Sequence, residues 1–482
     1  MGVKHVFGKF IRPAVIVLCA ILVFAVCAAC TAGGDSSTYD ESIPPEGSAA
    51  VQSSGEESGD TSASDPDESY PENIGATESA GEQYGTSTGS AAVNATAIPS
   101  ASAENSGTTA AATSAEQSKP PVNVEIEGEL RGVWVSYIEI DSMLKGKNAQ
   151  QAKSGIDTIM DNVVSYGLNT VMFHARSNSN AYYVSAPFKP AASAAGLLSG
   201  GFDPLEYAVE AAHSRGLALH AWINPYRIGT DKSYNMLDEK DMFTAPNANG
   251  TTIYYYIPTS MSAQTLIIDG VSEIVKNYNV DGVQFDDYFY PDVKTIIPRE
   301  APADFETESY GKYTGEGGKL GIADWRRVNV NALVANVYSR VKTDSKNRKA
   351  VFGISPSYNV ATNYSGFYAD VTLWMTSKGY LDYIAPQIYF GFEHRTAPFA
   401  PKADEWAAFP RDSSVTLYVG LPMYKSGITD GGSDEWKLND NIVRRQVEYV
   451  RKKSGISGFM VYTYSSFALF PKEAENLKAV LT

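Results

Sequence analysis

The sequence predicts an α/β fold: a (β/α)8 TIM barrel preceded by a disordered linker and an N-terminal leader. The first observation is that, from Arg131 onward, eight short apolar runs alternate with longer amphipathic stretches, as parallel strands and their connecting helices do. The second is that these runs alternate residue by residue between an aliphatic and a polar or aromatic face, which is the period of a strand. An open doubly wound sheet is the alternative, but the Gly-rich phosphate turn that such sheets usually carry does not follow the first strand.

The predicted elements follow one another in regular order. The predicted strands are residues 132–137, 170–175, 218–223, 282–285, 351–355, 383–388, 416–421 and 458–462. The predicted helices are residues 149–166, 204–215, 264–277, 324–342 and 440–453, the fourth with Asp324 as its cap. In the third strand Leu219 and Ile223 oppose His220 and Trp222. We expect the aliphatic face to meet the outer helices and the other face to become polar toward the C-terminal end, where barrel enzymes place their sites.

Residues 1–30 have the features of a secretory leader: the basic residues Lys4, Lys9 and Arg12, then an apolar run. Cys30 follows two alanines and is similar to the lipid-modified cysteine of a bacterial lipoprotein. We therefore expect a cell-membrane lipoprotein that faces the cell wall and is held by an N-terminal lipid anchor. The alternatives are ordinary cleavage, which would secrete the protein, and an uncleaved membrane anchor.

Residues 31–122 are rich in Ser, Ala, Gly, Thr, Asp and Glu, and positions 31–120 hold 15 acidic residues against one lysine. Such a segment buries too little apolar area to offset its ordering entropy, so a disordered acidic linker is expected. The predicted barrel domain is residues 123–482, and positions 121–482 hold 35 basic and 40 acidic residues. This near-neutral balance does not indicate nucleic-acid binding. The 3 cysteines all lie in the leader, so no disulfide or thiol chemistry is expected in the barrel.

The fourth predicted strand ends in two adjacent carboxylates, Asp286 and Asp287, followed by an aromatic cluster. Buried carboxylates must be paired, hydrogen-bonded or protonated, so this strand ending indicates a functional site. The strand period points Asp286 into the barrel mouth and Asp287 toward the outer loops. Glycoside cleavage needs two carboxyl groups, one that protonates the leaving oxygen and one that attacks or activates water. Asp286 is our candidate for one of the two.

The second carboxylate stays open at this point. Asp287 and Glu393 are the predicted catalytic residues beside Asp286, and Asp141 or Glu139 after the first strand are further candidates. The rings, amides and hydroxyls after the other strands suit the apolar face and hydroxyl rim of a pyranose sugar. The predicted sugar-binding residues are His174, Arg176, His220, Trp222, Asn224, Tyr226, Arg227, Tyr288, Gln387 and Tyr389.

Two other functions remain open. His174 and His220 could ligate a metal together with Asp286, which would indicate a metal-dependent polysaccharide deacetylase. Because no tight histidine spacing accompanies them, neither a metal nor another cofactor is predicted. A carbohydrate-binding lipoprotein that keeps the cleft without turnover is the other alternative. The expected partner is a polysaccharide in each case, and no protein partner is predicted.

Several short motifs follow one another in chain order. They are Arg131-Gly132-Val133-Trp134, Phe202-Asp203-Pro204-Leu205, the segment 220–227, the segment 281–291, Asp324-Trp325-Arg326-Arg327, Gly353-Ile354-Ser355-Pro356 and Pro386-Gln387-Ile388-Tyr389. Together they resemble the glycosyl hydrolase-like family 10 proteins of bacterial envelopes. The resemblance covers roughly residues 128–480.

The resemblance implies a TIM barrel and O-glycosyl hydrolysis of an envelope or extracellular polysaccharide, with peptidoglycan glycan strands favoured. It also implies that the Asp286-Asp287 strand end is the catalytic element and that the segment 220–227 forms part of the sugar cleft. The chain departs from the family pattern in two places. Ser357-Tyr358-Asn359 stands where relatives tend to carry a Trp-containing loop, which is expected to alter substrate choice. Gln264 stands where relatives often carry Arg, which is expected to be a structural difference.

Overall fold

The computed structural model describes residues 124–247 and 249–482. The predicted leader with Cys30 and the predicted linker (31–122) lie outside these described residues, and both stay predictions.

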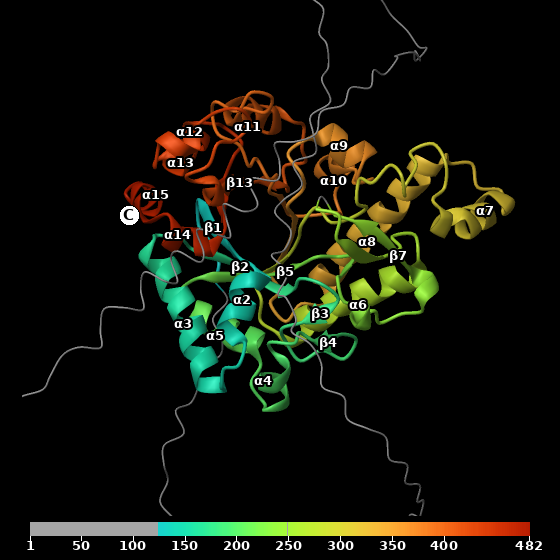
Figure 1. Ribbon diagram of the computed structural model, residues 1–482, viewed down its shortest axis with the longest axis horizontal. Coiled ribbons are helices and arrows are strands. Elements are labelled where there is room, and N and C mark those ends of the chain that lie inside the picture. Colours follow the sequence, from blue (N-terminus) through green and yellow to red (C-terminus); the bar gives the residue numbers. More distant parts are fainter. Residues whose placement is uncertain (1–123, 248) are drawn as a thin grey trace, which may run out of the picture. The chain divides into compact units, whose positions relative to one another are not determined.

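Parallel strands at the centre of the described part close into a barrel (Figure 1). They are β1 (Leu130–Val135), β2 (Thr170–Arg176), β5 (Ala218–Ile223), β9 (Gly282–Phe285), β10 (Val351–Ile354), β11 (Tyr383–Ile384), β12 (Thr416–Leu417), β13 (Val419–Pro422) and β14 (Gly458–Tyr462). They pair in parallel in the order β12-β11-β10-β9-β5-β2-β1-β14-β13. Only Tyr418 separates β12 from β13, so the two ends of the sheet are halves of one strand. The predicted (β/α)8 barrel is therefore confirmed.

The two faces of the barrel strands pack into different cores. Leu219 and Ile223 of β5 belong to the large apolar core between the strands and the helices. Trp222, which lies between them in the sequence, packs inside the barrel with Trp134 and Met172. The alternation along the strand therefore sorts the side chains as predicted. The inside of the barrel is a packed core, as is usual for this fold.

Helices surround the strands (Figure 1). They are α2 (Tyr137–Leu144), α3 (Ala149–Ser165), α4 (Ala195–Ser199), α5 (Pro204–His213), α6 (Met261–Asn277), α7 (Thr307–Gly315), α8 (Ile322–Asp344), α9 (Val360–Ser365), α10 (Val371–Thr376), α11 (Phe399–Ala408), α12 (Glu435–Leu438), α13 (Ile442–Val450), α14 (Tyr464–Leu469) and α15 (Pro471–Lys478). The five predicted helices correspond to α3, α5, α6, α8 and α13.

Local capping chemistry sets several helix starts. The Asp203 carboxylate accepts a hydrogen bond from the backbone N of Leu205 at 2.9 Å and begins α5. The prediction that Asp324 caps the fourth predicted helix is wrong. The helix, α8, begins at Ile322, and Asp324 lies in its first turn. In that turn Asp324 forms an ion pair with Arg327 at 2.6 Å. A negative charge in the first turn also stabilises a helix, because it interacts favourably with the helix dipole.

Short elements beyond the predicted ones follow the C-terminal ends of the strands and build the barrel mouth. They are β3 (Asn180–Ala181) with β4 (Lys189–Pro190), the antiparallel sheet of β6 (Arg227–Gly229), β8 (Thr252–Tyr256) and β7 (Met242–Pro246), and the 3-10 turns η2 (Lys232–Tyr234), η3 (Glu239–Asp241), η4 (Asp304–Glu306) and η5 (Met423–Lys425). A long insertion runs from β9 to α8 and carries η4 and α7.

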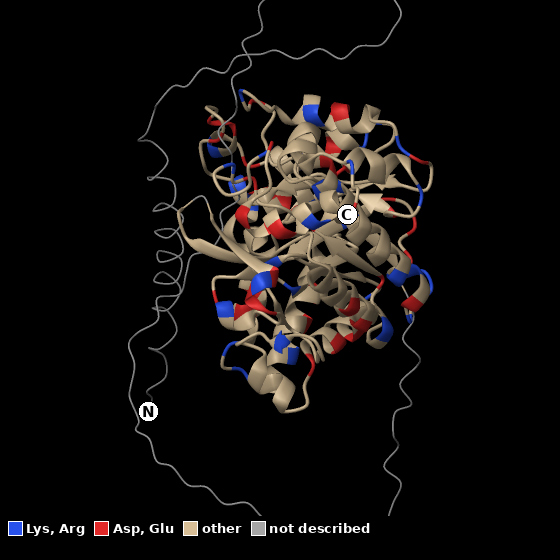
Figure 2. Cartoon of the chain, turned by 90° about the vertical axis from the view of Figure 1, so that its right-hand side faces the viewer, with Lys and Arg blue, Asp and Glu red and all other residues tan. Residues whose placement is uncertain are grey.

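Acidic and basic residues are interspersed along the ribbon in Figure 2, which matches the near-neutral charge of this part of the chain. None of the helices formed by residues 124–247 and 249–482 has the length and apolar character that crossing a membrane requires.

Candidate active site

Asp286 directly follows β9 and is nearly closed off from solvent at the barrel mouth, with 5% of its surface exposed. Its Oδ2 accepts a hydrogen bond from Trp222 Nε1 at 3.0 Å. Its Oδ1 accepts one from the backbone N of Tyr288 at 3.3 Å. Because Trp222 belongs to the inward face of β5, Asp286 points into the mouth as the strand period predicts.

Asp287 lies over the same mouth. Its Oδ1 accepts a hydrogen bond from Gln387 Nε2 at 3.1 Å, and the same amide nitrogen donates to the carbonyl of Ser355 at 2.9 Å. Ser355 and Gln387 follow β10 and β11, so this contact reaches across the ends of neighbouring strands. The predicted outward orientation of Asp287 is therefore wrong. The physical reason is that β9 ends at Phe285, and the strand period no longer applies to the turn that follows.

The environment of Asp286 favours its protonated form. Burial raises the pKa of Asp286 well above the usual carboxyl range, and the negative charge of Asp287 raises it further. Hydrogen bonds from Trp222 and from the backbone of Tyr288, together with the charge of Arg227, act in the opposite direction without cancelling the shift. A carboxyl that retains its proton toward neutral pH can serve as a general acid. The site thus joins a proton donor to a neighbouring carboxylate.

The raised pKa predicts that Asp286→Asn stabilises the fold at neutral pH. The folded-state pKa lies above the unfolded value of about 3.9, so ionising this carboxyl costs folding free energy. The contribution of Asp286 to stability is fully present below about pH 4 and is lost as the pH rises through the folded-state pKa. We expect Asp286→Asn to unfold at higher urea concentration than the wild type near pH 7, and this advantage to shrink toward pH 4. An advantage that does not change with pH would contradict the shift.

His174 is held as one neutral tautomer. The backbone N of Tyr137 donates to its Nδ1 at 3.3 Å, so Nε2 carries the proton and donates to Asn224 Oδ1 at 3.0 Å. Its ring stacks on Trp222 with centroids 3.5 Å apart. Burial lowers the pKa of His174 well below its usual range. The hydrogen bond to Asn224 raises this pKa, whereas the charges of two nearby arginines lower it further. Because both ring nitrogens already have partners in the protein, His174 positions Trp222 and Asn224.

His220 lies within the barrel. Its Nδ1 shares a hydrogen bond with the hydroxyl of Tyr383 at 3.0 Å, and burial lowers its pKa to about 4. Gly282 on the neighbouring strand leaves room for the ring, since a Cβ there would lie 2.8 Å from Nδ1. Across the described ranges, no group of three His, Cys, Asp or Glu side chains is arranged to hold a metal. The structure places His220 in the barrel core, so its contact with sugar stays a prediction.

Aromatic rings lie beside the two aspartates. Tyr389 stacks on Tyr462 with centroids 5.8 Å apart, and Trp134 meets Tyr389 edge-on at 6.5 Å. Burial raises the pKa of Tyr389, nearby tyrosines raise it further, and the charges of Asp287 and Asp286 add to the shift, so this ring is close to both carboxylates. The predicted set omits Tyr462 and Trp134. The signal that could have identified Trp134 is its inward register on β1, beside Met172 of β2.

The segment after β5 contributes one residue to the mouth and one to the core. The Arg227 guanidinium lies 5.4 Å from the ring centroid of Tyr288, and its charge acts on Asp286. Tyr226 instead lies fully buried in the core between strands and helices. The contact between Tyr226 and a sugar stays a prediction.

Arg176 is displaced from the mouth by an irregularity in β2. His174 pairs with Trp222, but the register then shifts and Arg176 pairs with Ile223, on the strand face that meets the helices. The guanidinium carbon lies 4.3 Å from the ring centroid of Phe188, and the side chain is fully buried. The bulge thus ends the alternation before Arg176, and the contact between Arg176 and a sugar stays a prediction.

Two of the candidate carboxylates are committed to structural hydrogen bonds. Glu139 lies in the first turn of α2 and accepts from Ser136, Thr463 and Ser465, which ties this turn to the end of β14. Asp141 accepts from the hydroxyls of Tyr182, at 2.9 Å, and Ser193. Both carboxylates therefore hold loops of the mouth in place.

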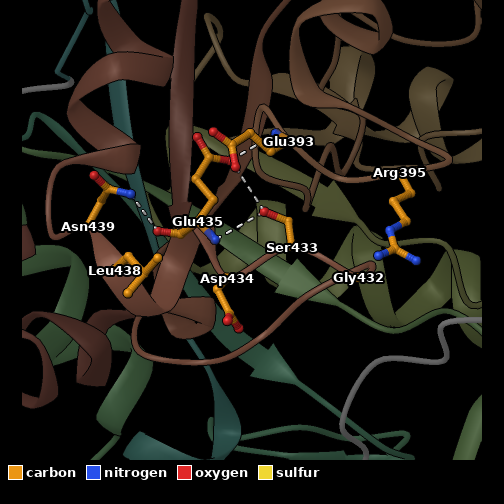
Figure 3. A pocket seen from close by; sticks show the side chains of 8 residues that line it. All are labelled: Glu393, Arg395, Gly432, Ser433, Asp434, Glu435, Leu438 and Asn439. Atoms are coloured by element: carbon orange, nitrogen blue, oxygen red, sulfur yellow. Dashed lines mark hydrogen bonds between the residues drawn. The ribbon is translucent and has the colours of Figure 1, made fainter.

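Glu393 belongs to a separate polar group (Figure 3). Its carboxylate accepts from Ser433 Oγ at 3.1 Å, and its backbone N donates to Glu435 Oε2 at 3.0 Å. A pocket of about 460 Å³ is lined by these residues together with Arg395, Gly432, Asp434, Leu438 and Asn439. Since neither aspartate lines this pocket, the catalytic role of Glu393 stays a prediction, and Asp287 is the better supported partner of Asp286.

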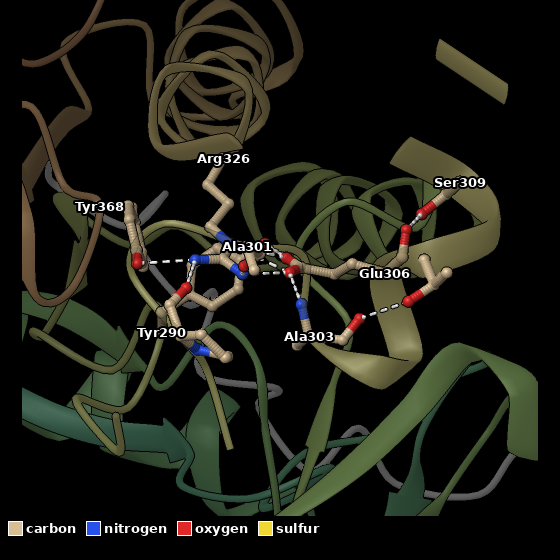
Figure 4. A network of polar contacts seen from close by, with 9 residues as sticks. Tyr290, Ala301, Ala303, Glu306, Ser309, Arg326 and Tyr368 are labelled. Carbon is tan, nitrogen blue, oxygen red and sulfur yellow. Dashed lines mark hydrogen bonds and ion pairs between the residues drawn. The ribbon is translucent and has the colours of Figure 1, made fainter. Parts of the chain in front are cut away.

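A buried ion pair anchors the segment that carries the aspartates (Figure 4). Arg326 of α8 and Glu306 of η4 are both fully buried, with Arg326 Nε 3.0 Å from Glu306 Oε2. The Tyr290 hydroxyl donates to Glu306 Oε1 at 2.8 Å, and Arg326 Nη1 donates to the Tyr368 hydroxyl at 2.7 Å. Because Tyr290 is close in sequence to Asp286, this network holds the insertion after β9 against α8.

The two departures from the family pattern have structural roles. Gln264 Nε2 donates to the carbonyl of Pro258 at 2.8 Å near the start of α6, which fits the expected structural role. The Asn359 side chain accepts from the backbone N of Thr362 at 3.0 Å and begins α9. The expected effect of Ser357-Tyr358-Asn359 on substrate choice stays a prediction.

Comparisons with known proteins agree with this geometry. A family model described as "Glycosyl hydrolase-like 10" matches residues 129–437. "Glycosyl hydrolase YngK" of Bacillus subtilis (strain 168) is 34% identical over 358 residues, which cover 68% of this chain and 68% of that protein. "Glycosyl hydrolase DigH" of Escherichia coli (strain K12) is 30% identical over 387 residues, which cover 72% and 85%. The glycoside hydrolase domain of PgaB (BpsB) from Bordetella bronchiseptica has a similar fold, with a TM-score of 0.51 and 14% identity over 73% of this chain and 99% of that domain.

Proposed function

Because the chain belongs to the glycosyl hydrolase-like 10 family and is a glycoside hydrolase, we propose that it cleaves O-glycosidic bonds of an envelope or extracellular polysaccharide, with peptidoglycan glycan strands favoured. One observation carries the chemistry. Asp286 is a buried carboxyl at the barrel mouth, with a raised pKa and with Asp287 and aromatic rings beside it.

In the proposed reaction Asp286 is the general acid. It gives its proton to the glycosidic oxygen while the bond from that oxygen to the anomeric carbon breaks. Asp287, held by Gln387, supplies the negative charge that stabilises the positive charge developing on the sugar ring. Water then adds to the anomeric carbon, and the proton that this water loses restores the acid. The products are two shorter glycans.

The walls of the mouth suit a sugar chain. The stacked rings of Tyr389 and Tyr462 provide an apolar surface, and pyranose rings have an apolar face that packs on such surfaces. Arg227, Asn224 and Gln387 provide polar groups for the hydroxyl rim. We further propose that lipidation at Cys30 holds the enzyme at the cell membrane, where the acidic segment 31–122 lets the barrel reach the cell wall.

Mass spectrometry of reaction products tests this function. The full-length protein is incubated in ¹⁸O-labelled water with purified peptidoglycan and, separately, with an unrelated polysaccharide. We expect shorter glycans from peptidoglycan, with ¹⁸O at the newly formed reducing ends, because water adds to the anomeric carbon.

The other outcomes identify the alternatives. Binding to peptidoglycan without any new reducing end would contradict hydrolysis and support the carbohydrate-binding lipoprotein. Release of acetate that stops with a chelator, without shorter glycans, would support the metal-dependent deacetylase. Cleavage of the unrelated polysaccharide alone would retain the hydrolase and overturn the proposed substrate.

A further inference from the structure

Arg176 is a buried cation whose donors have no hydrogen-bond partner in the described part of the chain. The side chain is 0% exposed, and Nε, Nη1 and Nη2 all lack a partner. The other fully buried arginine among the described residues, Arg326, bonds instead to a carboxylate, two carbonyls and a hydroxyl. Buried charges are normally paired in this second way, because an unpaired one carries a large desolvation cost.

Two tyrosine hydroxyls and a phenylalanine ring surround Arg176, and none of the three carries a negative charge that would pair with the guanidinium. The Tyr183 side chain is also almost fully buried. Its hydroxyl lies near that of Ser185, which already donates to Glu273. Burial raises the pKa of the Tyr183 hydroxyl, and the charge of the nearby Arg176 guanidinium lowers it. Phe188 covers the guanidinium at 4.3 Å and packs against Gly270 of α6. The hydroxyl of Tyr256 is already used by Ser179 and by the backbone of Met236.

The nearest carboxylates are committed elsewhere. Burial lowers the pKa of Arg176, whereas the negative charges of Glu273 and Asp286 raise it. Neither carboxylate forms an ion pair with Arg176 among the described residues. Glu273 accepts from Ser185 Oγ and from the backbone N of Ala186, both at 2.6 Å. Asp286 accepts from Trp222 and Tyr288. The cluster therefore holds a guanidinium that stays charged and whose three nitrogens have no hydrogen-bond partner among the described residues.

We propose that Arg176 and Tyr183 form a binding site for one small monovalent inorganic anion, of which chloride is the abundant example. An anion neutralises the buried guanidinium and accepts from several donors at once. A water molecule would accept two hydrogen bonds and leave the charge uncompensated. The closed apolar cover of Phe188 favours a small spherical ion over a bulky oxyanion. This inference stands on the buried cluster and is independent of which polysaccharide the enzyme cleaves.

A bound anion would stabilise the end of β2. The carbonyl of Arg176 accepts from the backbone N of Asn224 at 2.9 Å, and Asn224 in turn holds His174. The anion site thus lies behind the wall of the mouth and touches it through the backbone. Losing the anion is expected to loosen this wall.

Thermal unfolding in matched salts tests the site. The full-length protein is exchanged into sodium gluconate and titrated with sodium chloride or sodium bromide at constant ionic strength. We expect a saturable rise in Tm of about 5 °C at an anion concentration far above Kd. Crystals grown in bromide are expected to show one anomalous peak within contact distance of the Arg176 guanidinium.

Two variants and a control make the test specific. Arg176→Met is expected to abolish the halide-dependent rise in Tm. If that variant does not fold, Tyr183→Phe, which removes one donor, is expected to raise the apparent halide Kd severalfold. Tyr278→Phe is the control, because Tyr278 meets Tyr183 edge-on at 5.6 Å but its hydroxyl is already bonded to Asp203 at 2.6 Å. Equal Tm values in gluconate and halide, or an unchanged halide Kd in Tyr183→Phe, would overturn the proposal.

Discussion

Asp286→Asn is expected to lower kcat for glycan cleavage by a factor of about 10² to 10⁴, the usual contribution of a positioned general acid. Asparagine has nearly the same shape, and its amide oxygen can still accept from Trp222, so the mouth keeps its form. It cannot deliver a proton to the leaving oxygen. Because binding depends mainly on the walls of the mouth, we expect the Kd for the glycan to change little. Initial rates test the expected loss in kcat, and equilibrium binding of the same peptidoglycan fragments tests the expected constancy of Kd.

Asp292→Asn is the matched control for this variant. Asp292 lies in the same insertion and pairs with Arg299 at 3.1 Å on a partly exposed surface, so its loss should leave kcat unchanged. Full activity of Asp286→Asn would remove Asp286 from the mechanism and point to Glu393 or another carboxylate. Equal loss of activity in both variants would show that the insertion is sensitive to any charge change.

Arg326→Met is expected to lower the free energy of unfolding by about 3–5 kcal/mol, because it leaves Glu306 buried without its partner. The variant also removes the bonds from Arg326 to Tyr368 and to the carbonyls of Pro298 and Ala301. Urea unfolding at pH 7, with the midpoint and slope both determined, measures the loss.

Two further variants separate this effect from general damage. Arg340→Met removes the pair between the exposed Arg340 and the partly buried Asp344 of the same helix, 3.6 Å apart, and is expected to cost less than about 1 kcal/mol. The double variant Arg326→Met/Glu306→Leu removes both buried charges and is expected to recover part of the stability. A single-variant loss no larger than that of Arg340→Met would contradict the proposed anchoring role.

Much of the barrel could be predicted because each strand and helix carries its own periodic pattern. Trp222 and Asp286 illustrate how far this reaches into the site. Trp222 occupies an inward position of a regular strand, and Asp286 is the first residue after one, so the period predicts both directions. The two side chains then meet at 3.0 Å.

Prediction from the local pattern fails where a regular element ends. Arg176 follows a bulge in β2, and Asp287 lies in the turn after β9, so a period of two residues no longer sets the side-chain direction. Asp324 is not the cap, because α8 begins earlier than the apolar pattern indicates. For Asp287 a long-range contact, the hydrogen bond from Gln387, decides the outcome.

The sequence by itself determined the barrel, the order of its strands and the position of Asp286 at the mouth, because these follow from local periodicity and strand order. Only the tertiary structure decided which carboxylate accompanies Asp286. Glu139 and Asp141 are consumed by hydrogen bonds to residues far away in the chain, whereas Asp287 turns back over the mouth. The pKa of Asp286 has the same origin: burial and a neighbouring charge exist only once strands distant in sequence close around it.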